Sequence, residues 1–127
     1  PYQTLRLLQG DVGSGKTIVA LLAALQSIES GYQATLLAPT DILARQHFHN
    51  LQDLINRFGI SVAILTAREK GKARESILEQ LREGKIDILV GTHAVIQETV
   101  HFNNLGLVII DEQHRFGVAQ RSKLWKK

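Results

Sequence analysis

Mostly apolar runs of a few residues alternate along the chain with longer segments of mixed polarity. A run that is apolar at successive positions indicates a strand buried on both faces of a sheet. The expected strands cover residues 5–9, 34–38, 61–65, 86–90 and 105–110. The segments between them predict helices over residues 17–30 and 40–58, a third that ends at Gly84, a turn at 94–97 and a short helix at 118–127. This alternation predicts an α/β fold with helices on both faces of a mostly parallel sheet of five or more strands.

The segment from Thr40 to Gly59 shows the clearest helical pattern. Thr40 or Asp41 can cap its first turn, and Gly59 ends it. Its apolar residues follow one another at spacings of four, three, four and three, which is the period of one helix face. We expect these residues to share a buried face: Ala44, Phe48, Leu51, Ile55 and Phe58. His47 and His49 lie two positions apart, on different faces of this helix, so they are not expected to form a metal pair.

Residues 10–17, between the first strand and the first helix, fit the pattern G-x-x-x-x-G-K-[ST] of a loop that binds the phosphates of a nucleoside triphosphate. Glycines leave room for backbone N–H groups to turn toward phosphate oxygens, and the helix that follows directs its positive end at the same anion. Lys16 can reach the β- and γ-phosphates, and the Thr17 hydroxyl can ligate Mg²⁺. An ordinary glycine-rich turn, the alternative, would need neither side chain. The predicted ATP-binding residues are Gly10, Asp11, Val12, Gly13, Ser14, Gly15, Lys16 and Thr17.

Two carboxylates, Asp111 and Glu112, follow directly on the last expected strand. Hydrolysis of a nucleoside triphosphate requires Mg²⁺ near the β- and γ-phosphates, and an acid at this strand end commonly holds it, so Asp111 is the candidate. The attacking water must also be positioned and deprotonated, which suits Glu112. The alternative is a pair of solvated acids, but bound Mg²⁺ needs an anionic partner beside the P-loop. We therefore expect Glu112 and Lys16 to act in catalysis, and Thr17 and Asp111 to hold Mg²⁺.

The composition narrows the class of protein. A chain of 127 residues fits one domain, and its net charge of +3 permits an anionic partner without identifying one. Cysteine is absent, which excludes disulfides and thiolate metal sites and fits a reducing compartment. No run is long and apolar enough for a membrane span, and no secretion signal opens the chain. We therefore expect a cytoplasmic protein without a membrane partner.

Several segments together resemble the RecG family of ATP-dependent DNA helicases, in superfamily 2. Residues 111–114, Asp-Glu-Gln-His, are similar to the DEx[HD] motif of that superfamily. Transcription-repair coupling factors share much of the pattern, but they usually have an aromatic residue in place of Ser14 and Glu in place of Gln113. In one departure, residues 66–68 read Thr-Ala-Arg where RecG relatives often have Thr-Gly-Ser. The resemblance runs through residues 6–17, 38–40, 46–47, 70–74, 91–94 and 111–118.

This resemblance implies a RecA-like P-loop NTPase domain of three layers, which uses ATP and Mg²⁺ and acts on branched or forked DNA. It implies that Gln113 and His114 couple the nucleotide state to DNA, with simple packing or capping as the alternative for His114. Cations at residues 70–74 crowd a helix start, where the dipole disfavours them, and an external phosphate would relieve that cost. A solvated helix entrance is the alternative for this stretch. The residues that resemble DNA contacts are Pro39, Thr40, Thr66, Lys70, Lys72, Arg74, Thr92 and His93.

The resemblance also implies parts that residues 1–127 do not contain. Family members have a second motor lobe with an arginine finger, and RecG relatives have a wedge domain that grips branched DNA. Residues 1–127 would then be a truncated first motor lobe. The family's Ser-Ala-Thr strand, which normally separates the P-loop strand from the acidic strand, is missing, so we expect a gap or a non-native contact there. The alternatives are the same lobe of a transcription-repair coupling translocase, or a P-loop nucleotide switch without unwinding activity.

Overall fold

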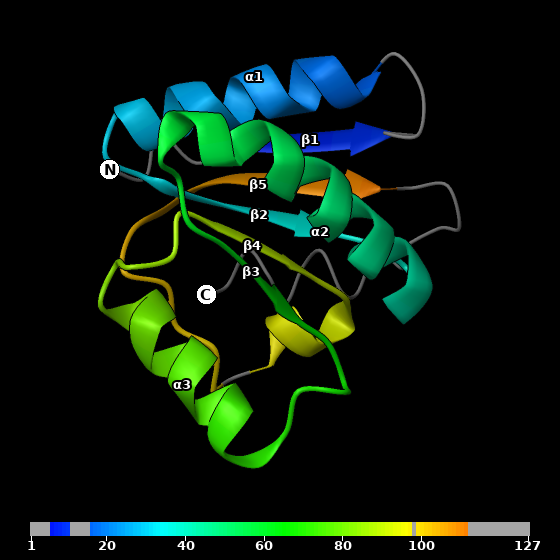
Figure 1. The fold of residues 1–127 in the computed structure, drawn as a ribbon, viewed down its shortest axis with the longest axis vertical. Coiled ribbons are helices and arrows are strands. Elements are labelled where there is room, and N and C mark those ends of the chain that lie inside the picture. Colours follow the sequence, from blue (N-terminus) through cyan, green and yellow to red (C-terminus); the bar gives the residue numbers. More distant parts are fainter. Residues whose placement is uncertain (1–5, 11–15, 98, 112–127) are drawn as a thin grey trace.

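The computed structural model describes residues 6–10, 16–97 and 99–111. Strands and helices alternate through these residues, as the sequence predicts. All the strands run in the same direction (Figure 1). The elements are β1 (Arg6–Gly10), α1 (Lys16–Glu29), β2 (Gln33–Leu37), α2 (Asp41–Ile55), η2 (Asn56–Phe58), β3 (Val62–Leu65), α3 (Gly71–Arg82), β4 (Ile88–Gly91), η3 (His93–Ile96) and β5 (Leu105–Asp111).

The strands form one five-stranded sheet in the order β1-β5-β2-β4-β3. Every neighbouring pair is parallel. The carboxyl ends of all the strands therefore lie at one edge of the sheet, and the register sets Gly10 of β1 opposite Asp111 of β5. This arrangement confirms the predicted parallel sheet, and it brings the P-loop segment next to the acidic segment.

Helices cover both faces of the sheet and complete three layers (Figure 1). On one face, α1 and α2 pack over alternate strand residues, among them Leu36, Ile88 and Ile109. On the other face, α3 and the turn at η3 pack over the residues that lie between these, such as Leu37 and Leu89. Because both faces are covered, the strands are apolar at successive positions, which is the pattern from which they were predicted.

The start of α2 agrees with the prediction, and its end differs from it. The Thr40 side chain accepts a hydrogen bond from the Leu43 N–H at 3.2 Å and caps the helix. Ala44 and Leu51 are buried against the sheet as expected, but 63% of Phe58 is exposed. The chain tightens to a 3₁₀ helix over residues 56–58, with three residues per turn, so the spacing that would have brought Phe58 onto the buried face is lost.

A close approach at Gly91 draws η3 toward the sheet. A Cβ at this position would overlap the Leu65 carbonyl oxygen and a methyl group of Val95. The missing side chain lets the chain turn from β4 directly into η3 and sets Thr92 and His93 at the carboxyl edge of the sheet. Glycine at this position is therefore a packing requirement of the fold.

Direct pairing joins β1 to β5, where a gap or a non-native contact was expected. Five register pairs link the two strands, so the gap is absent and the structure shows the other expected outcome, a direct contact in the place of the missing strand. The helix predicted at 118–127 lies outside the described residues. Among residues 6–10, 16–97 and 99–111, no helix combines the length and the apolar character that crossing a membrane requires.

Candidate functional site

Two of the predicted site residues, Gly10 and Asp111, meet at the carboxyl edge of β1 and β5. Gly10, the last residue of β1, is the register partner of Asp111, the last residue of β5. Helix α1 begins at Lys16, shortly after β1 ends. The structure thus brings the start of the predicted phosphate loop next to the predicted metal ligand. The remaining predicted residues of this site, Asp11, Val12, Gly13, Ser14, Gly15, Glu112, Gln113 and His114, lie outside the described residues.

The two helices that start at this edge differ in the charge of their first turns. Helix α2 has Asp41 in its first turn and the Thr40 hydroxyl as a cap. Helix α1 is 14 residues long and has no acidic residue in its first turn. The partial positive charge at its amino end is therefore not balanced by an acid of that turn, and a phosphate group would supply the balancing anion.

Asp111 is the best-defined acid of the site. Its side chain is only 1% exposed, and its Oδ2 atom lies 3.1 Å from Nε2 of His47 on α2. Sequence reasoning rejected His47 as half of a metal pair and did not predict this contact. A signal was present, because positions 44, 47 and 51 follow one another at helical spacings of three and four on the face that packs against the sheet.

A carboxylate at this place fits Mg²⁺, which prefers oxygen ligands and usually takes only one or two from protein carboxylates. Within the described part of the chain, no group of three or more His, Cys, Asp or Glu side chains gathers as metal ligands. The Thr17 hydroxyl stays a predicted second ligand.

Beside this site, a hydrogen-bonded network ties the start of α2 to the loop that follows β3. Arg45 donates to Asp41 Oδ2 at 3.2 Å, to Glu69 Oε2 at 2.9 Å and to Thr66 Oγ1 at 3.3 Å. The backbone N–H and the hydroxyl of Thr66 donate to Glu69 Oε1 at 2.7 and 2.8 Å. Arg68 adds an ion pair to Asp41 at 3.5 Å. This network fixes the shape of the rim on both sides of Arg45.

The charge state of Glu69 depends on the same network. Burial by itself raises the pKa of the Glu69 carboxyl, since the charged form loses solvent. Hydrogen bonds from Arg45 and Thr66 outweigh that effect and hold the pKa of Glu69 below its usual value. Glu69 is therefore ionised at neutral pH and keeps the loop tied to Arg45.

The residues predicted to contact DNA fall into two groups in the structure. Thr66 and Thr92 are buried, and the Thr66 hydroxyl is bonded within its own loop. Arg74 is half-buried and donates to Gln97 Oε1 at 2.8 Å and to Thr99 Oγ1 at 3.1 Å, which joins α3 to the loop after η3. These three shape the rim, and direct contact with DNA stays a prediction for them. The others are exposed, or half-exposed in the case of Pro39: Pro39, Thr40, Lys70, Lys72 and His93.

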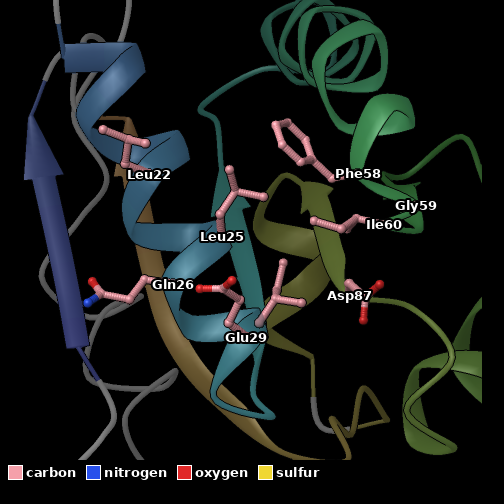
Figure 2. Close-up of a pocket in the computed structure, with 9 residues that line it drawn as sticks. Leu22, Leu25, Gln26, Glu29, Phe58, Gly59, Ile60 and Asp87 are labelled. Carbon is pink, nitrogen blue, oxygen red and sulfur yellow. The ribbon is translucent and has the colours of Figure 1, made fainter.

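A hollow of about 540 Å³ lies at the opposite edge of the sheet, away from the candidate site. Figure 2 shows it between α1 and the segment that leads into β3. Its lining includes Leu22 and Phe58, which are 60% and 63% exposed, and Asp87 near the start of β4. The hollow contains none of the residues that the sequence assigns to nucleotide or DNA.

Comparison with known proteins agrees with this geometry. The model of the DEAD/DEAH box helicase family matches residues 4–127. The chain is 59% identical to the ATP-dependent DNA helicase RecG of Bacillus subtilis (strain 168) over 127 residues, which is 100% of the chain and 19% of the relative. It is 55% identical to the ATP-dependent DNA helicase RecG of Escherichia coli (strain K12) over 123 residues, which is 97% of the chain and 18% of the relative.

A solved structure of RecG bound to a three-way DNA junction has the same fold. It matches with a TM-score of 0.77 and 55% identity, over 88% of this chain and 15% of that one. These matches confirm the resemblance to RecG that the sequence motifs indicated, together with the predicted fold class. The chain spans about one fifth of the length of the curated relatives that it matches.

Proposed function

The chain belongs to the DEAD/DEAH box helicase family, and from this premise we propose that it is the first motor lobe of an ATP-dependent DNA helicase that remodels branched DNA. The observation that carries the proposal is the buried acid Asp111 at the end of β5, on the same carboxyl edge of a parallel sheet at which β1 ends before the phosphate loop. The second motor lobe and the DNA-gripping domain belong, in this proposal, to the longer protein.

Each residue of the site has a distinct task in this proposal. Lys16 and the amino end of α1 hold the phosphates, and Thr17 with Asp111 holds Mg²⁺. When bound, the ion neutralises charge that develops on the phosphate oxygens. Glu112 orients the attacking water and accepts its proton. Gln113 and His114 link this site to the DNA.

Two substitutions in the full-length protein test these assignments. Lys16→Ala removes the cation that faces the phosphates, so nucleotide binding or turnover should be lost. Glu112→Gln keeps the size of the side chain but cannot accept a proton, so ATP binding should persist while turnover falls. ATP turnover at the wild-type rate in Lys16→Ala, or loss of binding in Glu112→Gln, would show that the roles are assigned wrongly.

DNA is proposed to lie along the rim formed by the strand ends and the start of α3. The exposed cations Lys70 and Lys72 support this part of the proposal, because they stand at the start of α3, where the first turn has no acidic residue and the helix dipole disfavours cations. Reversing both charges should lower DNA affinity and reduce the salt dependence of binding by about one unit of slope per lost phosphate contact. Arg82→Glu, at the exposed far end of α3, is the matched control. An unchanged salt slope would favour the solvated helix entrance.

The alternatives make different predictions for the full-length protein. A motor hydrolyses ATP faster when DNA is added, whereas a nucleotide switch without unwinding activity does not need DNA to turn over. Unwinding of a forked DNA separates a RecG-like motor from a transcription-repair translocase, which would instead displace RNA polymerase. We also propose a cytoplasmic location, since the enzyme must reach DNA and the chain has no cysteine to suit an oxidising compartment.

A further inference from the structure

The contact between His47 and Asp111 joins two segments that lie 64 positions apart in the chain. The distance from Nε2 to Oδ2 is 3.1 Å, and the two side chains are 12% and 1% exposed. A carboxylate oxygen accepts hydrogen bonds, so in the tautomer that protonates Nε2 the imidazole donates to Asp111. A nearly buried acid is thus held by a nearly buried donor from another layer of the fold.

Packing of α2 fixes the place of the imidazole. Ala44, one helical turn before His47, is fully buried, and Leu51, one turn after it, is also buried. Both belong to the apolar cluster between α2 and the sheet. His47 therefore lies on the inner face of a helix that is anchored on both sides of it, and its ring has little freedom to move away from Asp111. His49, two positions further on, is exposed.

The alternation of β5 fixes the direction of the carboxylate. Leu107 and Ile109 pack in the cluster under α1 and α2, whereas Val108 and Ile110 pack in the cluster on the other face. Asp111 continues this alternation, so its side chain lies on the face of α1 and α2. Helix α1, which begins just after the phosphate loop, packs on the same face. The hydrogen bond on Oδ2 restricts rotation of the Asp111 carboxylate and so fixes its orientation relative to that loop.

We propose that His47 is a positioning residue of the Mg²⁺ site, which holds the Asp111 carboxylate in the orientation that ligates the ion of the bound nucleotide. The inference rests on the proposed function, because it assigns a partner to the acid of that same site. Hydrogen-bonded partners of metal-ligating carboxylates typically contribute 10- to 100-fold to metal affinity or activity. The role is one of orientation, and His47 does not touch the phosphates in it.

Binding of Mn²⁺, followed by its electron paramagnetic resonance signal in the presence of a non-hydrolysable ATP analogue, tests the proposal in the full-length protein. His47→Ala removes the donor, and His47→Gln offers an amide N–H at a comparable reach. His49→Ala is the matched control on the same helix. Affinity for the analogue without metal is measured in parallel for each variant, since a purely structural defect would change both quantities.

The expected result for His47→Ala is a Mn²⁺ dissociation constant raised about tenfold, with metal-free nucleotide affinity within twofold of wild type. His47→Gln should recover most of the loss, and His49→Ala should behave as wild type. If His47→Ala binds Mn²⁺ with wild-type affinity, or loses metal-free nucleotide binding as much as Mn²⁺ binding, the role of His47 is overturned and the proposed function still stands. Absence of Mn²⁺–nucleotide binding in the wild type overturns the proposed function as well. Should His47→Ala fail to fold, His47→Leu fills the volume without a donor and carries the same expectations.

Discussion

The link between Arg45 and Glu69 determines how firmly the rim loop after β3 is held. Arg45→Met keeps most of the apolar stem and removes the hydrogen bonds to Asp41, Thr66 and Glu69. Hydrogen bonds to charged groups contribute about 1.5–3 kcal/mol when they are buried, and exposed ion pairs contribute about 0–1 kcal/mol. The Arg45 and Glu69 side chains are 30% and 16% exposed, so we expect a local loss of about 1–2 kcal/mol, between these limits.

Hydrogen exchange of the rim loop in the full-length protein measures this loss. A change of about 1–2 kcal/mol corresponds to exchange that is roughly 5- to 30-fold faster at residues 66–70, because locally opened states become more populated. The exposed Arg82 provides the matched control as Arg82→Met. The double variant with Glu69→Gln should lose less than the sum of the single variants, since both remove the same ion pair. Equal exchange of the loop in Arg45→Met and wild type at pH 7 would refute the reasoning.

The ion pair between Arg45 and Glu69 also predicts that the stability of the rim loop depends on pH. The pKa of Glu69 is lowered in the folded protein, so the stabilisation from its ion pair is fully present above the unfolded pKa of about 4.3. It is lost as the pH falls through the lower pKa of the folded state. The difference in loop protection between wild type and Arg45→Met should therefore narrow below about pH 4. A difference that stays constant down to pH 3 would exclude Glu69 as the partner that matters.

Three further substitutions test the fold that holds the site. Gln33→Leu removes a buried side chain that donates to two carbonyl oxygens and accepts from the Asn104 N–H. It should destabilise the sheet by about 2–5 kcal/mol, which would be measured as faster hydrogen exchange of the β2 and β5 amides. Gly91→Ala forces an overlap with Val95 and should cost about 1–3 kcal/mol, seen as a lower melting temperature. Thr40→Ala removes a helix cap and should cost about 1 kcal/mol, with faster exchange confined to the first turn of α2. Wild-type behaviour in any of the three would contradict the contact named for it.

Local patterns were enough to predict the strands, the parallel sheet and the capped start of α2. Each of these depends on residues that are close in sequence, such as Thr40 and Leu43, or on runs that are apolar at successive positions. The exposure of Phe58 could not be predicted in this way, because a helical pattern does not show where α-helical turns tighten into a 3₁₀ helix. The end of α2 was therefore placed too late.

In the candidate site, too, the residues of short motifs were predicted and the contacts between distant segments were missed. Gly10, Lys16 and Asp111 were predicted from motifs whose chemistry is contained in a short segment. The partner of Asp111 was missed, because His47 reaches it only after α2 has packed on the sheet. The bonds of Thr66 to Glu69 were also missed, and they indicate a structural role for a hydroxyl that had been predicted to face DNA. Contacts of this kind become visible only when distant segments have been placed together.

ATP hydrolysis by the full-length protein, measured with and without forked DNA, tests the central claim most directly. The account predicts hydrolysis that rises severalfold when the DNA is added. In Asp111→Asn, which leaves the fold of β5 in place but weakens the metal ligand, the rate should fall to background with or without DNA. An ATP hydrolysis rate that does not change when DNA is added, or that stays at the wild-type value in Asp111→Asn, would contradict the assignment of this chain as a DNA-stimulated motor lobe with Asp111 as its metal ligand.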